Sequence, residues 1–136
     1  MSEVPRETYE FTKNIPFSEH LGIKVDALEK GVARLSMLIR PEFMTSWGTA
    51  HGGSILALLD ITMSMAARTL YDPPRSVMTI DLSTQFIGTA SGLLRAESRV
   101  IKAGLSTIFC EGEARDEKGE LVAKAIGTFR AISPKP

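Results

Sequence analysis

One segment, residues 51–70, limits the possible folds of this chain more than any other. Its sequence is HGGSILALLDITMSMAARTL, and its apolar residues recur at the spacing of an α-helix. They are Ile55, Leu58, Leu59, Met65 and Ala66, with further apolar side chains at Leu56, Ile61 and Met63. A helix that is apolar nearly all round is typical of one buried inside a fold. The Tyr71-Asp72-Pro73-Pro74 stretch ends it, so the rest of the chain must cover one long helix.

Alternation of apolar and polar residues predicts strands on both sides of this helix. Before the helix, residues 23–27 and 33–39 flank a Glu29-Lys30-Gly31 turn, a pattern typical of a hairpin. After the helix, four further runs alternate, at 78–86, 94–101, 108–115 and 121–130. We interpret them as three or four strands in meander order. One long helix against an antiparallel sheet is an α+β fold.

The faces of these strands can be assigned from the same alternation. In the strand after the helix, one face would carry Met78, Ile80, Leu82 and Phe86, and the other Thr79, Asp81, Ser83 and Gln85. Small residues line one face of the last two strands, namely Gly112, Ala114, Ala123, Ala125 and Gly127. Their size leaves room for the helix to lie close on the sheet.

The length of 136 residues fits a single domain. Residues 1–16 are polar, carry two prolines and are interpreted as an N-terminal arm that is ordered only if it packs on something. The domain itself would span residues 17–136 and begin with a short helix, Phe17 to Gly22.

Charge and composition limit the classes of partner that we expect for this chain. Sixteen basic residues balance sixteen acidic ones, which argues against nucleic acid as the main partner. The single cysteine, Cys110, excludes an intrachain disulfide and a cysteine zinc cluster, and it fits a reducing compartment. We find no secretory signal and no apolar run of membrane-spanning length, so we expect a cytoplasmic protein with no membrane partner. With two histidines, a dense metal site is not expected, whereas a carboxylate-based one stays open.

Asp60 is the most informative candidate residue. It is the only formally charged side chain between His51 and Ala67, on a helix that is otherwise apolar or small. A carboxylate in such a setting is costly unless it is paired, hydrogen-bonded or protonated. Asp60 is therefore either a structural carboxylate at an exposed edge or a catalytic base or nucleophile.

Gly52 and Gly53 open the same helix. Glycines are poor helix formers, but in the first turn their N–H groups are uncapped and bare of side chain. A ligand oxygen can approach closely there, and the helix dipole favours negative charge. The pair is interpreted either as an oxyanion hole or as a tight loop-to-helix turn.

The distance between these candidates has a consequence for assembly. Gly52 and Asp60 are eight residues apart, which is about 12 Å along a helix axis. One helix cannot bring both to the same carbonyl carbon. Because the chain has only one long helix, joint action on one substrate requires a second subunit and predicts a two-fold dimer with two shared sites.

The loop before the helix offers weaker candidates. Thr45, Ser46 and Thr49 can bind substrate, cap the helix or simply be polar loop residues. Trp47 and Phe43 can wall a pocket or pack. His51 alone is more often structural than catalytic. Cys110 falls on the apolar face of its strand, which favours a buried thiol. Neither a P-loop nor a dinucleotide fingerprint is present.

Three stretches together resemble one family. The pattern Gly-x-x-His-Gly-Gly, followed by six residues and an Asp, runs here from Gly48 to Asp60. It resembles the PaaI-like branch of the hotdog-fold acyl-CoA thioesterases, named after phenylacetic acid degradation. Residues 17–23 (FSEHLGI) and 111–129 (EGEARDEKGELVAKAIGTF) resemble the opening helix with its first strand and the closing hairpin of that family.

The resemblance implies a fold, an assembly and a reaction. The fold would be a long central helix wrapped by an antiparallel sheet, in homodimers that pair their sheets edge to edge and commonly form homotetramers as dimers of dimers. The reaction would be hydrolysis of an acyl-CoA thioester at the dimer interface, with no metal and no cofactor, CoA being part of the substrate.

The resemblance also implies roles for single residues. Asp60 would be the general base or nucleophile, and the Gly52 amide of the other subunit would polarise the thioester carbonyl. Thr79 would assist Asp60 or its water. His51, beside Gly53, would help to position the substrate.

Two departures from the family pattern concern substrate binding. Thr45-Ser46 stands where the family usually has Asn-Pro, and Thr45 lacks the paired donor and acceptor of an amide. In the stretch Lys102-Ala103-Gly104-Leu105-Ser106, relatives often carry a basic residue after the glycine, and Leu105 removes it. Contacts to the CoA phosphates would then fall on Lys102, Arg99 or Arg130, unless these are only solvated surface charges.

Two other functions compete with the thioesterase. One is a non-catalytic acyl-CoA binding module, which would show saturable affinity without thiol release. The other is a hotdog hydratase or dehydratase, in which the catalytic histidine belongs to a different helix-entry signature. Because His51 precedes the helix here, the sequence favours this last alternative least.

Overall fold

The predicted buried helix forms as α3, Gly52–Arg68, and it is the centre of the computed structural model, which describes residues 3–132. Three short helical segments precede the sheet: α1 (Arg6–Tyr9), the 3-10 helix η1 (Phe11–Asn14) and α2 (Pro16–Leu21). A second 3-10 helix, η2 (Pro41–Phe43), leads toward α3. The strands are β1 (Lys24–Glu29), β2 (Val32–Leu38), β3 (Val77–Phe86), β4 (Leu93–Ala103), β5 (Thr107–Arg115) and β6 (Leu121–Ala131).

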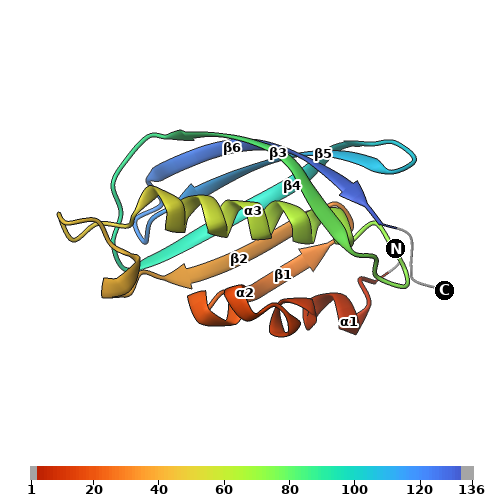
Figure 1. Cartoon of the computed structure of the whole chain (residues 1–136), viewed down its shortest axis with the longest axis horizontal. Coiled ribbons are helices and arrows are strands. Elements are labelled where there is room, and N and C mark those ends of the chain that lie inside the picture. Colours follow the sequence, from red (N-terminus) through yellow and green to blue (C-terminus); the bar gives the residue numbers. More distant parts are fainter. Residues whose placement is uncertain (1–2, 133–136) are drawn as a thin grey trace.

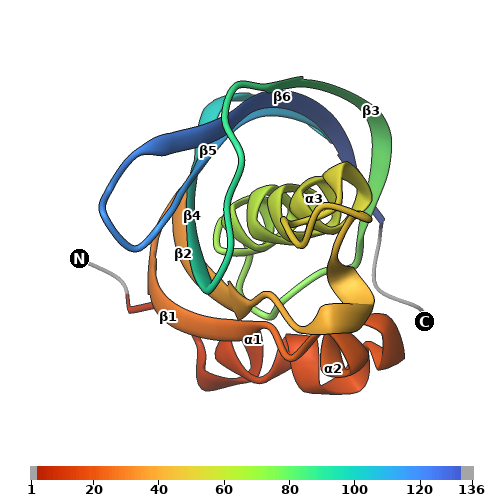
Figure 2. The same ribbon diagram turned by 90° about the vertical axis from the view of Figure 1, so that its left-hand side faces the viewer.

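The six strands form one antiparallel sheet that curls around α3 (Figure 1). The view along the helix in Figure 2 shows the sheet bent around it, with α1 and α2 lying beyond β1. Eleven side chains of α3 are buried, and the helix packs on β2, β3, β4, β5 and β6. This confirms the expected α+β fold with one long helix wrapped by an antiparallel sheet.

The order of the strands confirms a meander of three strands and excludes a meander of four. Neighbouring strands follow the order β1-β2-β4-β5-β6-β3, so β4, β5 and β6 form a meander but β3 does not pair with β4. β3 lies at the far edge beside β6, and β4 pairs with β2. A local alternation pattern gives a strand its two faces but not its partner, which is chosen by packing across the helix.

The predicted faces of β3 are wrong at the start of the strand. Thr79 lies opposite Phe129, but Asp81 lies opposite Thr128, because the register shifts at Ile80. Cross-strand partners share a face of the sheet. Since Phe129 is buried beneath the sheet, Thr79 lies on the helix side with Leu82, whereas Met78, opposite Arg130, lies on the outer side. One extra residue in a bulge moves a side chain to the opposite face.

Small residues let the helix approach the sheet closely, as their pattern predicts. A Cβ atom on Gly127 would lie 2.8 Å from Phe129 Cε2, 3.1 Å from Leu82 Cδ2 and 3.2 Å from Met63 Cε. A Cβ atom on Gly112 would lie 2.5 Å from Ser98 Oγ and 3.3 Å from Met63 Cγ. Met63 of α3 therefore fills the space that these two glycines leave open.

The N-terminal segment packs on the domain. Thr8 and Thr12 are buried, and Tyr9 donates a hydrogen bond from its hydroxyl to the Leu28 carbonyl of β1 at 3.1 Å. The Phe11 ring covers the guanidinium of Arg68 at the end of α3, 4.0 Å from ring centroid to Cζ. Gly22 ends α2 in the left-handed conformation at φ 69°.

The two edges of the sheet differ. β1 runs beside the N-terminal helical turns (Figure 2), whereas β3 presents a row of large apolar side chains to solvent. These are Met78, Ile80, Phe86 and the following Ile87, each more than half exposed. An exposed apolar edge strand is a template for pairing with another chain. Within residues 3–132, no helix combines the length and apolar character that crossing a membrane requires.

The close approach of α3 to the sheet predicts the cost of adding a methyl group. Gly127→Ala should lower the free energy of unfolding by about 1–3 kcal/mol, because overpacking forces neighbouring side chains to move. The matched control is Gly104→Ala in the β4–β5 turn, where the new Cβ meets only a backbone oxygen at 3.6 Å. Urea unfolding at one protein concentration measures both, and equal midpoints for the two variants would contradict the packing argument.

Candidate active site

The N-terminus of α3 is capped by His51. The backbone of His51 is extended, and its Nδ1 accepts a hydrogen bond from the Gly53 N–H at 2.8 Å. The N–H groups of Ser54 and Ile55 both donate to the His51 carbonyl. The expectation that both glycine N–H groups are uncapped is therefore wrong for Gly53. For Gly52, no acceptor of its N–H lies within residues 3–132, so this donor is available to a ligand.

The space beside Gly52 is taken by an aromatic ring. A Cβ atom on Gly52 would lie 3.5 Å from Phe86 Cε1 at the end of β3. Phe86 is about half exposed, so its ring forms a wall next to the free N–H. Sequence reasoning missed this neighbour, because only the pairing of β3 along β6 brings it to the start of α3.

The loop before α3 is a tight turn with its own hydrogen bonds. Thr45 Oγ1 lies 3.1 Å from Thr49 Oγ1 and accepts from the Trp47 N–H at 3.2 Å. Gly48 adopts a positive φ of 77°, which completes the turn. Thr45 thus holds the shape of the loop. Phe43 is buried and packs, whereas Trp47 is 86% exposed at the tip of the turn and so lies largely in solvent.

Asp60 and Thr79 are brought together by α3 and β3. The Thr79 hydroxyl donates to Asp60 Oδ1 at 2.6 Å, a short bond of the kind that a charged acceptor makes. The bulge at Ile80 is what points Thr79 toward the helix. Asp60 is half-buried and lies by the exposed edge strand rather than deep in the core. One carboxylate oxygen is held by Thr79, which fixes the direction of the other.

The structure keeps Gly52 apart from Asp60. Both lie on the single helix α3, two turns and more from each other, at about 12 Å along its axis. The pairs that do meet are Asp60 with Thr79, Gly53 with His51, and Gly52 with Phe86.

The β4–β5 turn lies at the other end of the sheet from Gly52. Lys102 is exposed and opposes Phe109, and the Gly104 N–H donates to the Thr107 carbonyl at 2.8 Å. Ser106 accepts from the Ala131 N–H through its carbonyl. Of the other two basic candidates, Arg99 is paired with Glu111, and Arg130 is exposed on β6.

Cys110 is a buried thiol, as its strand face predicts. Its Sγ lies 3.7 Å from the Met63 carbonyl, to which it donates. Burial raises the pKa of this thiol to about 12, which keeps it protonated at neutral pH. A protonated buried thiol is not a nucleophile.

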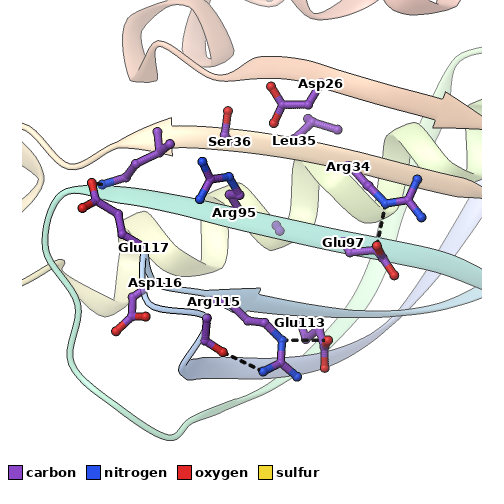
Figure 3. A pocket seen from close by; sticks show the side chains of 13 residues that line it. Asp26, Arg34, Leu35, Ser36, Arg95, Glu97, Glu113, Arg115, Asp116 and Glu117 are labelled. Atoms are coloured by element: carbon purple, nitrogen blue, oxygen red, sulfur yellow. Dashed lines mark hydrogen bonds and ion pairs between the residues drawn. The ribbon is translucent and has the colours of Figure 1, made fainter.

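A separate hollow of about 410 Å³ lies on the outer face of the sheet (Figure 3). Charged side chains of β1, β2, β4 and β5 line it, and none of the candidate site residues does. Arg34 pairs there with Glu97 at 2.6 Å and Arg115 with Glu113 at 3.1 Å. The charge of Glu97, through its hydrogen bond, raises the pKa of Arg34 further. These mutually paired charges form a solvated face rather than a reactive site.

Comparison with known proteins gives the family. The profile of the thioesterase superfamily matches residues 48–123, which hold α3 and the strands β3, β4 and β5. A protein of Saccharolobus solfataricus that is provisionally named an esterase is 35% identical over 126 residues, 92% of this chain and 89% of that protein. The medium/long-chain acyl-CoA thioesterase YigI of Salmonella typhimurium is 25% identical over 135 residues, covering 88% of this chain and 87% of its own.

A solved structure gives the fold type. The E. coli PaaI protein from the phenylacetic acid degradation operon superposes with a TM-score of 0.88, over 98% of this chain and 99% of its own, at 17% identity. The chain belongs to the thioesterase superfamily, and its fold is the hotdog fold of PaaI-like proteins. This confirms the family resemblance and makes the chain a hydrolase of thioester bonds.

The capping bond predicts a specific effect of substitutions at His51. His51→Ala should lower the free energy of unfolding by about 0.5–2 kcal/mol, since it removes the acceptor for Gly53 N–H. His51→Asn should retain most of the stability, because asparagine is a good N-cap residue. Urea unfolding compares the three proteins, and an Asn variant as unstable as the Ala variant would show that the side chain does not act as a cap.

Proposed function

We propose that this chain acts in the cytoplasm as an acyl-CoA thioesterase that releases a free acid and CoA at a site shared between two subunits. The acyl group would be aromatic or of short to medium chain length. The observation that carries the proposal is the division of the site along α3. A carboxylate held by Thr79 lies at the middle of α3 and a free N–H donor lies at its N-terminus, too far apart to meet on one carbonyl group.

The exposed edge of the sheet supports a dimer as the active unit. β3 ends the sheet with open backbone groups and large apolar side chains, of which Ile80 is 57% exposed. Pairing of β3 with β3 of a second copy would bury these side chains and extend the sheet. In an antiparallel pair, the start of one β3 lies near the end of the other, so Asp60 beside Thr79 would approach the Gly52 beside the other copy's Phe86.

The outer face of the sheet supports a further association of two dimers. Phe109, Ile126 and Ile101 are exposed there, beside polar neighbours. Apolar side chains gathered on one face of a sheet favour packing against another surface. We therefore propose a tetramer built as a dimer of dimers.

The chemistry follows from charge development in thioester hydrolysis. The Gly52 N–H would donate to the carbonyl oxygen as it becomes an oxyanion, aided by the helix dipole. As a general base, Asp60 would take a proton from water while the oxygen attacks the carbonyl carbon; the C–S bond then breaks and the thiolate takes up a proton. As a nucleophile, Asp60 would attack the carbonyl carbon and expel the CoA thiolate, which takes up a proton; water would then hydrolyse the mixed anhydride to the free acid and restore the carboxylate. Both routes need only groups of this chain and water.

The remaining predicted residues are assigned to substrate binding. His51 keeps the first turn in place through Gly53, and Thr45 shapes the loop that carries the exposed Trp47 near the same helix end. Lys102, with Gly104 and Ser106 in its turn, would contact the phosphates of CoA as an exposed cation. In this scheme Trp47 and Phe86 offer apolar surface to the substrate.

Thiol release from a panel of acyl-CoA compounds tests the proposal. The panel runs from acetyl to palmitoyl and includes phenylacetyl and hydroxybenzoyl thioesters. Asp60→Asn should lower kcat by at least about a hundredfold without unfolding the protein, because no other carboxylate within residues 3–132 is hydrogen-bonded to Thr79. The matched control is Asp26→Asn on β1, which removes the same charge from an exposed position and should turn over like wild type.

The outcomes separate the competing functions. Release that depends on Asp60 supports the thioesterase and ranks the acyl groups. Saturable acyl-CoA binding without release from a folded protein would contradict it and favour a binding module. If Asp60→Asn keeps nearly wild-type turnover, Asp60 is not a catalytic residue.

A further inference from the structure

Phe86 is the last residue of β3, and its ring points toward α3. It pairs with Ala123 of β6, which is buried beneath the sheet. Cross-strand partners share a face of the sheet, so Phe86 lies on the helix side as well. Its Cε1 and Cζ atoms lie 3.5 and 3.6 Å from the position that a Cβ atom on Gly52 would take. The ring therefore covers one side of the residue that carries the free N–H donor.

This ring contacts the helix and is still 52% exposed. Leu82, four residues earlier on the same side of β3, packs against the core beside Gly127. Phe86 lies beyond that core, where the first turn of α3 is uncovered, so it presents apolar surface to a ligand at the donor. Trp47, the other aromatic side chain near this helix end, is 86% exposed at the tip of a loop. Phe86 is thus the ring that the fold holds in place beside Gly52.

The distance from the ring to the donor brings a bound carbonyl group within reach of the ring. By standard bond lengths, the Gly52 nitrogen lies about 2.5 Å from the Cβ position, so Cε1 of Phe86 is at most about 6 Å from that nitrogen. A carbonyl oxygen that accepts from this N–H lies about 2.9 Å from the nitrogen, and its carbon atom is one bond further. Carbon atoms bonded to the carbonyl can then touch the exposed part of the ring at the usual distance of about 4 Å.

The fold separates the groups that suit the two ends of a thioester. The phosphates of CoA need a cation, and Lys102 in the β4–β5 turn is the one proposed above. This turn lies beside the start of β3, because Val77 pairs with Ala131, whose N–H donates to the Ser106 carbonyl. Phe86 lies at the opposite end of the same strand. In the antiparallel dimer proposed above, each shared site would therefore combine the turn of one copy with the Phe86 ring of the other.

We propose that Phe86 is the specificity-determining residue for the acyl group. The acyl chain next to the carbonyl packs on this ring in the subunit that supplies the Gly52 donor, while CoA extends toward the β4–β5 turn of the other subunit. The proposal rests on the proposed function, because it orients the substrate in the same site. Because the ring offers apolar surface to carbon atoms that an acetyl group lacks, it favours acyl groups of several carbons over acetyl.

Thiol release from hexanoyl-CoA and acetyl-CoA tests this proposal as a ratio of two kcat/KM values, which does not depend on the fraction of active protein. Phe86→Ala should lower the hexanoyl-to-acetyl ratio by about tenfold, because only the longer chain loses its contact. The inhibition constant of free CoA should stay within about twofold of wild type. The matched control is Phe17→Ala, which removes the same ring from α2, where Phe17 is 58% exposed, and should keep the wild-type ratio.

A second variant keeps the test decisive if Phe86→Ala does not fold. Phe86→Thr also lacks the ring, and threonine is favoured in strands, so the same fall of the ratio is expected. An unchanged ratio in a folded variant without the ring, or a loss confined to the binding of free CoA, overturns the proposal.

Asp60→Asn measured beside these variants separates the two levels of the account. If it keeps wild-type turnover, or if the wild type releases no thiol from either compound, the proposed function fails. If release depends on Asp60 but the hexanoyl-to-acetyl ratio does not depend on Phe86, only the role of Phe86 is lost.

Discussion

The burial of α3 within the sheet is the constraint on which the rest of the structure depends. A helix that is apolar on nearly every face needs cover on nearly every face, and one six-stranded sheet supplies it only by curling. The curl requires close contact, which Gly112 and Gly127 permit by leaving space for Met63. The sheet does not close on itself, so β3 remains as an open apolar edge.

The same constraint decides where chemistry can occur. A ligand can reach polar groups of this helix only where the cover is incomplete, namely at its first turn and on the side facing β3. The free Gly52 N–H and the Asp60–Thr79 pair occupy these two places. Both groups lie on the same helix, so its length separates them. Pairing with a second copy at the open edge of β3 would bring the donor of one copy close to the carboxylate of the other. The site and the assembly are thus two consequences of one buried helix.

The sequence predicts the parts of this arrangement that are local. The spacing of apolar residues gives the buried helix, and alternation gives the strands and the small residues that face it. Asp60 stands out because a single charge in an apolar stretch requires an explanation. The features that the sequence does not predict are contacts between distant segments. The pairing of β3 with β6, the bulge that turns Thr79 inward and the ring of Phe86 beside Gly52 all depend on contacts between distant segments.

The central claim, a site shared between two subunits, is tested most directly by mixing two inactive variants. Asp60→Asn removes the carboxylate, and Gly52→Pro removes the N–H donor at a helix position that tolerates proline. Each is expected to be inactive alone. Co-expressed with different tags and purified through both, the mixed dimers contain one intact site and one doubly defective site, so about half of the wild-type thiol release should return. Mixed dimers that are folded but no more active than either parent would contradict a shared site.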